Sequence, residues 1–292
     1  MRSDVQSWVG ERQSSKKQTQ HLLKLLEIGF VSPAEFRDEV ILIAIKQSRN
    51  CPNPLRALEC WKALAVLSST FPPSERCFYP LLNYFKSQAL TNKNTEVREW
   101  ARYIFARILK VYENESRRGI PSLNEIEAIL NKKQMPLRVY FMNGHDIVLY
   151  MESYTTIKHL RDEIVQKTQL KKEMFPYFSI YEVCEKKETY EERYLENDVL
   201  LSDVLDRWDK EKDTDSAADF KLYFRIRIFF PLDYKEEDSV VMFYNQMLYE
   251  YRLGRYPCEE KDVVTLAALA CQNEFGNSLP EPDAEFRYFY LS

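Results

Sequence analysis

The spacing of the apolar residues changes at Pro136, and this change most constrains what the chain can fold into. Before Pro136, apolar residues recur three and four positions apart, which is the period of a helix with one buried face. After it, they alternate with polar residues, which is the period of a strand with one buried face. The sequence therefore predicts a helical body followed by a body built around a sheet. With 292 residues, the chain has room for two or three domains that each bury a core.

The clearest helix in the first part is predicted from about Thr95 to Tyr112, with Thr95 as its N-cap. Its apolar stripe consists of Val97, Trp100, Ala101, Ile104, Phe105, Ile108, Leu109 and Tyr112. A further helix is expected after Ser32-Pro33, and proline-containing segments at 51–54 and 71–74 separate the next ones. A short linking helix is predicted at Leu123–Leu130. Trp61 and Trp100 are expected to anchor the helical core.

The second part begins with a strand that reaches Asn143-Gly144, a dipeptide that favours a tight hairpin turn, and a second strand follows at 145–151. A helix is predicted from Thr155-Thr156, then strands at 177–183 and 220–228 with a short helix at 199–208 before the last strand. This order is typical of a ubiquitin-like fold. In the last strand we expect Leu222, Phe224, Ile226 and Ile228 in the core, and Lys221, Tyr223, Arg225 and Arg227 in water. Two helices are predicted past Pro231, at 238–252 and 259–273.

Three blocks of the first part resemble a known family. The stretch RALECWKALAVLSSTFPPSERCFYPLLNYF, residues 56–85, with Trp61 and Pro73, is similar to a myosin tail homology 4 domain. Arg37-Asp38-Glu39, followed by Lys46-Gln47, matches another part of that pattern. Glu192-Arg193-Tyr194-Leu195 and the segment 203–208 resemble the first FERM lobe of myosin tails. The chain therefore resembles the myosin tail homology 4 plus FERM tandem of an unconventional myosin tail, myosin VII-like.

The resemblance implies an α+β multidomain architecture: an all-α bundle, a ubiquitin-like β-grasp FERM lobe, and the first helices of the helical second FERM lobe. It implies a polar lead-in at 1–20, the helical domain at 21–131, the first FERM lobe at 132–230 and a partial second lobe at 231–292. We expect the chain to be truncated within the FERM module, with the third lobe absent. We also expect Arg37, Asp38, Glu39, Lys46 and Gln47 to serve structure through pairing across helices.

The resemblance also implies a function. We expect a non-catalytic tail module that links a motor to cargo, to membrane proteins or to microtubules. Alternatives are a motorless FERM-type adaptor that joins membrane proteins to the cytoskeleton, and a kinesin-type tail. Expected partners are microtubules, actin through a motor that this chain lacks, the cytoplasmic tails of cargo or membrane proteins, and an intramolecular contact with the motor. No nucleic-acid partner is expected.

The sequence offers little for catalysis, cofactors or metals. None of the six glycines lies in a phosphate-binding loop motif, and the three histidines stand apart from one another without a metal-ligand spacing. The six cysteines include no C-x-x-C pair, and we expect reduced, mostly buried thiols. The first residues carry charges where a signal peptide needs an apolar core, and no long apolar run follows. We therefore expect no enzyme activity, no cofactor and no metal, and a cytoplasmic, cytoskeletal location.

Charge is distributed unevenly, because Lys and Arg exceed Asp and Glu before Pro136 and the reverse holds after it. The basic part could attract acidic partners, or the acidic part of the same chain could contact it. The candidate partner-binding residues lie on or before the helix at 95–112: Lys86, Lys93, Arg98, Arg102 and Lys110. The alternative for these side chains is ordinary helix solvation with pairing to Glu96 and Glu99.

Overall fold

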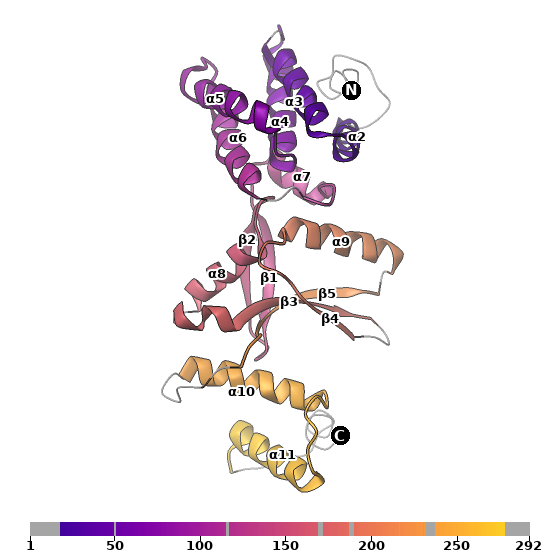
Figure 1. Ribbon diagram of the computed structural model, residues 1–292, viewed down its shortest axis with the longest axis vertical. Helices are drawn as coiled ribbons and strands as arrows, with labels where there is room; N and C mark the ends of the chain where they lie inside the picture. The colour runs from indigo at the N-terminus through magenta and orange to yellow at the C-terminus, as the bar shows by residue number, and fades with distance from the viewer. Residues whose placement is uncertain are drawn as a thin grey trace.

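The computed structural model describes residues 18–49, 51–114, 117–168, 172–186, 190–215, 217–229, 231 and 237–277. Three bodies follow one another along the long axis of the molecule: a helical body, a sheet body and a pair of C-terminal helices (Figure 1). The expected α+β architecture is confirmed. Of the predicted polar lead-in, residues 1–17 lie outside the described residues, and 18–20 belong to the first described helix. Residues 278–292 also lie outside them.

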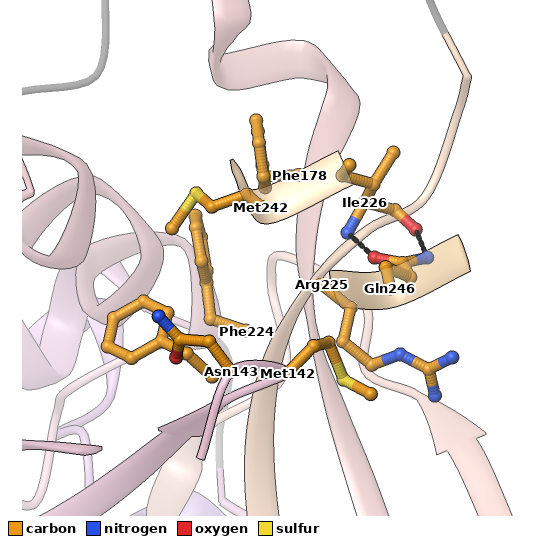
Figure 2. Close-up of a pocket in the computed structure, with 9 residues that line it drawn as sticks. Met142, Asn143, Phe178, Phe224, Arg225, Ile226, Met242 and Gln246 are labelled. Atoms are coloured by element: carbon orange, nitrogen blue, oxygen red, sulfur yellow. Dashed lines mark hydrogen bonds between the residues drawn. The ribbon is translucent and has the colours of Figure 1, made fainter. Parts of the chain in front are cut away.

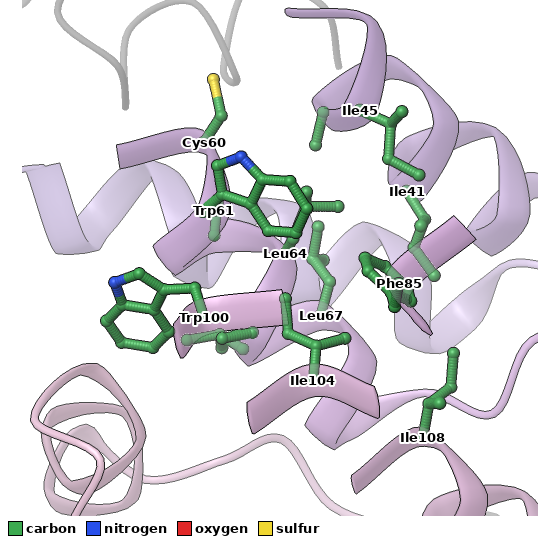
Figure 3. Packing of buried hydrophobic residues seen from close by; sticks show 14 of the residues in the cluster. Ile41, Ile45, Cys60, Trp61, Leu64, Leu67, Phe85, Trp100, Ile104 and Ile108 are labelled. Atoms are coloured by element: carbon green, nitrogen blue, oxygen red, sulfur yellow. The ribbon is translucent and has the colours of Figure 1, made fainter. Parts of the chain in front are cut away.

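The helical body contains α2 (Gln18–Val31), α3 (Ala34–Arg49), α4 (Pro54–Thr70), α5 (Glu75–Thr91), α6 (Thr95–Glu113) and α7 (Leu123–Leu130). Helix α4 is its centre, since it packs against α3, α6 and α7. Almost every side chain from Cys60 to Thr70 is buried, so this helix lacks a solvent face over its second half. Figure 3 shows Trp61, Leu64 and Leu67 of α4 among Phe85, Trp100 and Ile104 from the surrounding helices.

Side-chain caps fix where these helices begin. The side chain of Asn53 accepts from the N–H of Leu55 and precedes Pro54, a residue suited to a first helical turn. Ser74 caps α5 and Ser122 caps α7 in the same way. The prediction that Thr95 caps α6 was wrong: Asn94 is the cap, and its Oδ1 accepts from the N–H groups of Glu96 and Val97.

The sheet body is a five-stranded sheet in the order β2-β1-β5-β3-β4, formed by β1 (Met135–Phe141), β2 (Asp146–Met151), β3 (Phe178–Glu185), β4 (Tyr190–Tyr194) and β5 (Asp219–Ile226). β1 and β5 are parallel, and the other neighbouring pairs are antiparallel. The β1–β2 turn contains Gly144 at φ +82°, a conformation that glycine adopts without steric cost. Buried faces of α8 (Ile157–Lys167) and α9 (Leu201–Thr214) share one core with the sheet.

Three details of this body differ from the sequence prediction. β4 was not among the strands predicted from the alternation of residues. Helix α9 continues to Thr214, past the predicted end at Trp208. Its last turns carry charged side chains that water solvates, so they need no packing partner. β5 ends at Ile226, so Ile228 is 51% exposed rather than in the core, and Arg225 is buried rather than in water. The turn of 3₁₀ helix η1 (Lys172–Tyr177) leads into β3.

The C-terminal helices are α10 (Glu237–Arg252) and α11 (Glu260–Phe275), close to the predicted pair. Helix α10 packs against β5, whereas α11 buries only Ala270 and Cys271. In the part of the chain that the structure describes, no helix is both long enough and apolar enough to cross a bilayer.

Candidate interaction surfaces and the junctions that hold them

The Arg37-Asp38-Glu39 segment of α3 connects the ends of two other helices. The Arg37 guanidinium donates from Nε to the carbonyl of Gly29 at 2.8 Å and from Nη2 to that of Phe30 at 3.2 Å, which satisfies the last turn of α2. The buried Asp38 carboxylate accepts from the N–H of Ser74 at 3.0 Å, where α5 begins. Arg37 and Asp38 therefore pair across helices, with backbone groups at the ends of α2 and α5.

The other residues of the matched pattern divide into surface and core. Glu39 and Lys46 form an exposed ion pair at 4.0 Å, and Gln47 is half-buried. Pro73 is buried at the entry to α5. Trp61 is 3% exposed and packs edge-on against Phe85, and Trp100 is 5% exposed and lies under the Lys132 ammonium group at 4.4 Å.

The five candidate basic residues do not form one continuous patch. Lys86, Lys93 and Arg102 are exposed and form no ion pair with any described residue. Arg98 is half-buried, and its guanidinium donates to the Asn92 carbonyl and to Thr95 Oγ1, both at 3.0 Å, so it closes the turn between α5 and α6. Lys110 pairs with Glu113 at 3.2 Å and lies eight residues after Arg102, about 12 Å along the helix. The predicted partner Glu99 pairs with Lys132 instead, at 3.3 Å.

Polar contacts join the helical body to the sheet body. Arg107 of α6, 9% exposed, forms an ion pair with Glu152, which follows β2. The same guanidinium stacks over the ring of Tyr103 at 3.3 Å. Asn114 donates to the carbonyl of Tyr154 at 2.8 Å. Because ion pairs and hydrogen bonds between buried groups depend strongly on geometry, these contacts fix the angle between the two bodies.

The segment that connects the two bodies is held at both ends. The Asp203 carboxylate, in the first turn of α9, accepts from the N–H of Arg118 at 2.9 Å and from that of Gly119 at 3.0 Å. Arg117 is buried and pairs with Glu125 at 2.7 Å while it donates to the Gly119 carbonyl. A side chain at position 119 would meet Asp206 Oδ2 at 2.1 Å, so only glycine fits here without displacement. We call this set of contacts, together with Arg107–Glu152, the first junction.

A second junction attaches α10 to the sheet. Arg225, 3% exposed, pairs with Glu192 of β4 and, at 2.9 Å, with Glu250 of α10. The Gln246 side chain accepts from the N–H of Ile226 at 2.6 Å and donates to its carbonyl at 2.8 Å, as the dashed lines in Figure 2 show. Both free backbone groups at the end of β5 are thus satisfied by one side chain from α10.

Around the second junction, further side chains bind the two carboxylates that pair with Arg225. Arg255 pairs with Glu192 at 2.8 Å, and Tyr256 donates to Glu250 at 2.8 Å. Burial, together with the hydrogen bond to Glu250, raises the pKa of Tyr256 to about 12. At the first junction, burial raises the pKa of Tyr103 to about 12 as well. The Tyr256 phenol therefore keeps the proton that it donates to Glu250 well above neutral pH.

The cavities beside these junctions are small. One lies between the β1–β2 turn, β5 and α10, where Met142, Phe224 and Met242 line it (Figure 2). Its volume of about 10 Å³ has room for one water molecule. A second cavity of about 10 Å³ lies at the first junction, beside Ser69 and Tyr154. Neither has the volume of a substrate or cofactor site.

Reactive groups are not gathered anywhere in the described residues. No cluster of three or more His, Cys, Asp and Glu side chains there could hold a metal ion. Burial raises the pKa of the Cys77, Cys184 and Cys271 thiols, which lowers their reactivity at neutral pH. The buried polar groups at the two junctions hold the three bodies together, so the protein can present the surfaces of these bodies in a fixed relative orientation.

The residues that matter most to this arrangement escaped sequence reasoning. Arg225 was expected to face water, Gln246 had no predicted role, and Asp203 was noted only within the segment 203–208 that resembles a FERM lobe. Only Asp203 offered a sequence signal for its role, because an acidic side chain in the first turn of a helix often accepts from free backbone N–H groups. The partner N–H groups belong to another segment, 84 and 85 positions away in sequence.

Comparisons with known proteins match the three bodies in order. Residues 22–128 match the MyTH4 domain family, residues 133–228 the RA-like domain family and residues 230–291 the FERM central domain family. Myosin-VIIa of Drosophila melanogaster is 28% identical over 280 residues, which cover 92% of this chain and 12% of that protein. The kinesin-like protein KIN-14I of Oryza sativa is 26% identical over 259 residues, which cover 83% of this chain and 20% of that protein. The chain thus spans a small part of these relatives.

Solved structures show the same fold. The MyTH4-FERM MF1 domain of Dictyostelium discoideum myosin VII superposes with a TM-score of 0.82 at 20% identity, over 98% of this chain and 58% of that one. The C-terminal MyTH4-FERM domain of human myosin 7b, solved in complex with the harmonin-a PDZ3 domain, has a TM-score of 0.70 at 19% identity. That match covers 95% of this chain and 56% of the myosin 7b chain.

Proposed function

Because this chain combines a MyTH4 domain with FERM-type domains and is homologous to myosin VII tails, we propose that it is a non-catalytic tail module that links a motor to cargo. The observation that carries this proposal is the pair of junctions, in which buried ion pairs hold three bodies in one orientation. A rigid assembly of this kind presents its surfaces together, as a protein that recognises several partners requires.

We assign residues 21–131 to the MyTH4 domain, 132–230 to the ubiquitin-like first FERM lobe and 231–292 to part of the second lobe. The family matches at 22–128, 133–228 and 230–291 support this division. The change from helix α7 to strand β1 within residues 131–134 supports the first boundary. Truncation within the FERM module, the absence of the third lobe and a contact with the motor stay predictions.

The partners are proposed to be the cytoplasmic tails of cargo or membrane proteins, with a location at the cytoskeleton. The human myosin 7b structure supports protein partners, since its MyTH4-FERM domain is in complex with a PDZ domain. The kinesin-like relative keeps the kinesin-type tail as an alternative, and a motorless adaptor remains the other. Since the two cavities beside the junctions have room only for water, we expect recognition on the surface of the protein.

Full-length transcripts that contain this reading frame distinguish the three hypotheses. We expect an actin-type motor encoded upstream in the same frame, and a tagged endogenous product that redistributes when actin filaments are depolymerised. A kinesin-type motor upstream would replace the proposal with the kinesin hypothesis. A complete reading frame without any motor, whose product still concentrates at the membrane, would replace it with the adaptor hypothesis.

Binding to microtubules is a second candidate function, favoured by the exposed side chains of Lys86, Lys93 and Arg102. The acidic tails of tubulin would complement them, and a longer range of attraction at low salt should strengthen the contact. Arg98 and Lys110, also proposed for this surface, contribute less because both are engaged within the helical body.

Cosedimentation of the whole chain with microtubules across a salt series tests this second function. We expect binding at low salt that the double change Lys86→Glu and Arg102→Glu abolishes. Lys158→Glu, an exposed lysine at the start of α8 on the sheet body, is the matched control and should bind like the unchanged chain. Absence of binding at low salt, or an equal loss in the control, would reject microtubule binding through these residues.

A further inference from the structure

Strand β2 forms one edge of the sheet, and its outer side carries free backbone groups. In the register with β1, Phe141 donates to the His145 carbonyl at 2.8 Å, so the hydrogen-bonded pairs continue at Ile147, Leu149 and Met151. Because such pairs alternate in an antiparallel ladder, Asp146, Val148 and Tyr150 direct their N–H and C=O groups away from the sheet. Among the described residues, no hydrogen bond to these groups is formed.

The side chains at this edge are unusually apolar for an exposed strand. Val148 is 41% exposed and Tyr150 is 56% exposed, on the sheet face opposite the buried Leu149. Asp146 is also exposed and pairs with Arg138 of β1 at 3.3 Å. Free edges are commonly protected by lysine, proline or a bulge, because an open edge pairs with other strands. Here the centre of the edge holds a β-branched residue and an aromatic one, which both favour pairing.

We propose that β2 pairs antiparallel with β2 of a second copy of this chain, about a twofold axis at Val148. In this register Val148 faces Val148 of the second copy, and Asp146 faces Tyr150 of the second copy on each side. Every outward N–H of one strand then meets an outward C=O of the other, so all the free edge groups are satisfied. No like charges face each other across the two strands, and like charges in directly opposed positions would destabilise the pairing. A register shifted by two residues would leave edge groups unpaired at both ends.

The distribution of charge along the molecule supports the same pairing. The helical body lies at the Met151 end of β2, where Arg107 contacts Glu152, and α10 lies at the opposite end, where it shares a cavity with Met142 and Asn143. β1 and β2 run along the long axis (Figure 1). An antiparallel pair therefore places the basic helical body of one copy beside the acidic C-terminal helices of the other. This inference does not depend on the proposed function.

Sedimentation of the whole chain over a concentration series tests the proposal. We expect a monomer–dimer equilibrium that weakens as salt is raised, because oppositely charged bodies face each other. Val148→Lys places two ammonium groups at the axis and should raise the dimer dissociation constant at least about tenfold. Val148→Pro removes an outward N–H that takes no part in the ladder to β1, and it should act similarly. Leu90→Lys, at a comparably exposed apolar site on α5, is the control and should leave the equilibrium unchanged.

A cysteine at the axis provides a second measurement that does not depend on loss of binding. Directly opposed residues of a hydrogen-bonded antiparallel pair have Cα atoms about 5.5 Å apart, which suits a disulfide. Val148→Cys should therefore form a covalent dimer under mild oxidation. Leu90→Cys is the control, and it measures the background of disulfide formation to which the exposed Cys258 contributes. Val148→Cys should exceed this background. A chain that stays monomeric at all concentrations would overturn the proposal. So would a dimer that survives Val148→Lys but dissociates with Val264→Lys, which would place the contact on the exposed face of α11.

Discussion

Replacing Arg225 with methionine should weaken the attachment of α10 to the sheet. The Arg225 guanidinium lies between the carboxylates of Glu192 and Glu250, whose side chains are 15% and 14% exposed. Methionine keeps much of the volume but removes the charge, so two largely buried carboxylates would be left close together. Breaking a buried ion pair by removing one partner costs about 3–5 kcal/mol.

The contacts that remain place the cost at the lower end of that range. Arg255 still pairs with Glu192, and Tyr256 still donates to Glu250. We therefore expect about 3 kcal/mol, which corresponds to roughly a hundredfold shift in the equilibrium between attached and detached α10. The cation–aromatic contacts of Arg225 with Tyr181 and Tyr249, at 5.2 and 5.5 Å, would be lost as well.

Hydrogen exchange measured by mass spectrometry reports this local opening separately from global unfolding. Amides around Gln246–Glu250 should exchange roughly a hundredfold faster in Arg225→Met, while those of α4 should keep their rates. Adding Glu250→Gln should recover part of the loss, because it removes one of the unpaired charges. Arg193→Met, an exposed arginine on β4, is the matched control. If Arg225→Met and Arg193→Met accelerate α10 equally, or if α4 accelerates as much as α10, the reasoning about a buried charge at this junction is wrong.

Two further changes test the first junction. Gly119→Ala should lower the free energy of unfolding by about 1–3 kcal/mol, because its Cβ would lie 2.1 Å from Asp206 Oδ2. Thermal unfolding of Gly119→Ala with and without Asp206→Ala checks this. The second change makes room for the Cβ, so it should reduce the loss. The raised pKa of Tyr103, about 12 against an ordinary 10, means that the folded chain holds this proton after the unfolded chain releases it. Stability should therefore fall as pH rises from 10 to 12, and Tyr103→Phe should reduce that fall whereas the surface change Tyr79→Phe should not.

Local patterns predicted the elements well where one residue or one period decides them. The stripe at 95–112 lies on α6, and the linking helix at Leu123–Leu130 has the predicted bounds. The Asn143-Gly144 turn and the strand alternation after Pro136 predicted the hairpin, because strand period and turn preference depend on neighbouring residues. The error at the N-terminus of α6 was also local: Asn94 and Thr95 both suit a cap, and the backbone course between α5 and α6 selects between them.

The candidate basic surface was only partly predictable, since its residues have different partners in space. Sequence spacing placed Arg98 and Arg102 on one face of α6. It could not show that Arg98 closes a turn at Asn92 while Arg102 remains exposed. A charged side chain looks the same in sequence whether it faces water or a carbonyl from another segment.

The amino-acid sequence by itself determined the succession of a helical body, a β-grasp sheet and two further helices, because helix and strand periods are short-range properties of the chain. Tertiary structure alone decided how these bodies are joined. Arg225 alternates like a water-facing residue, yet the packing of α10 over the end of β5 buries it between two carboxylates. Asp203 binds a connector 84 positions away, and no local pattern of residues can indicate a contact between segments so far apart in sequence.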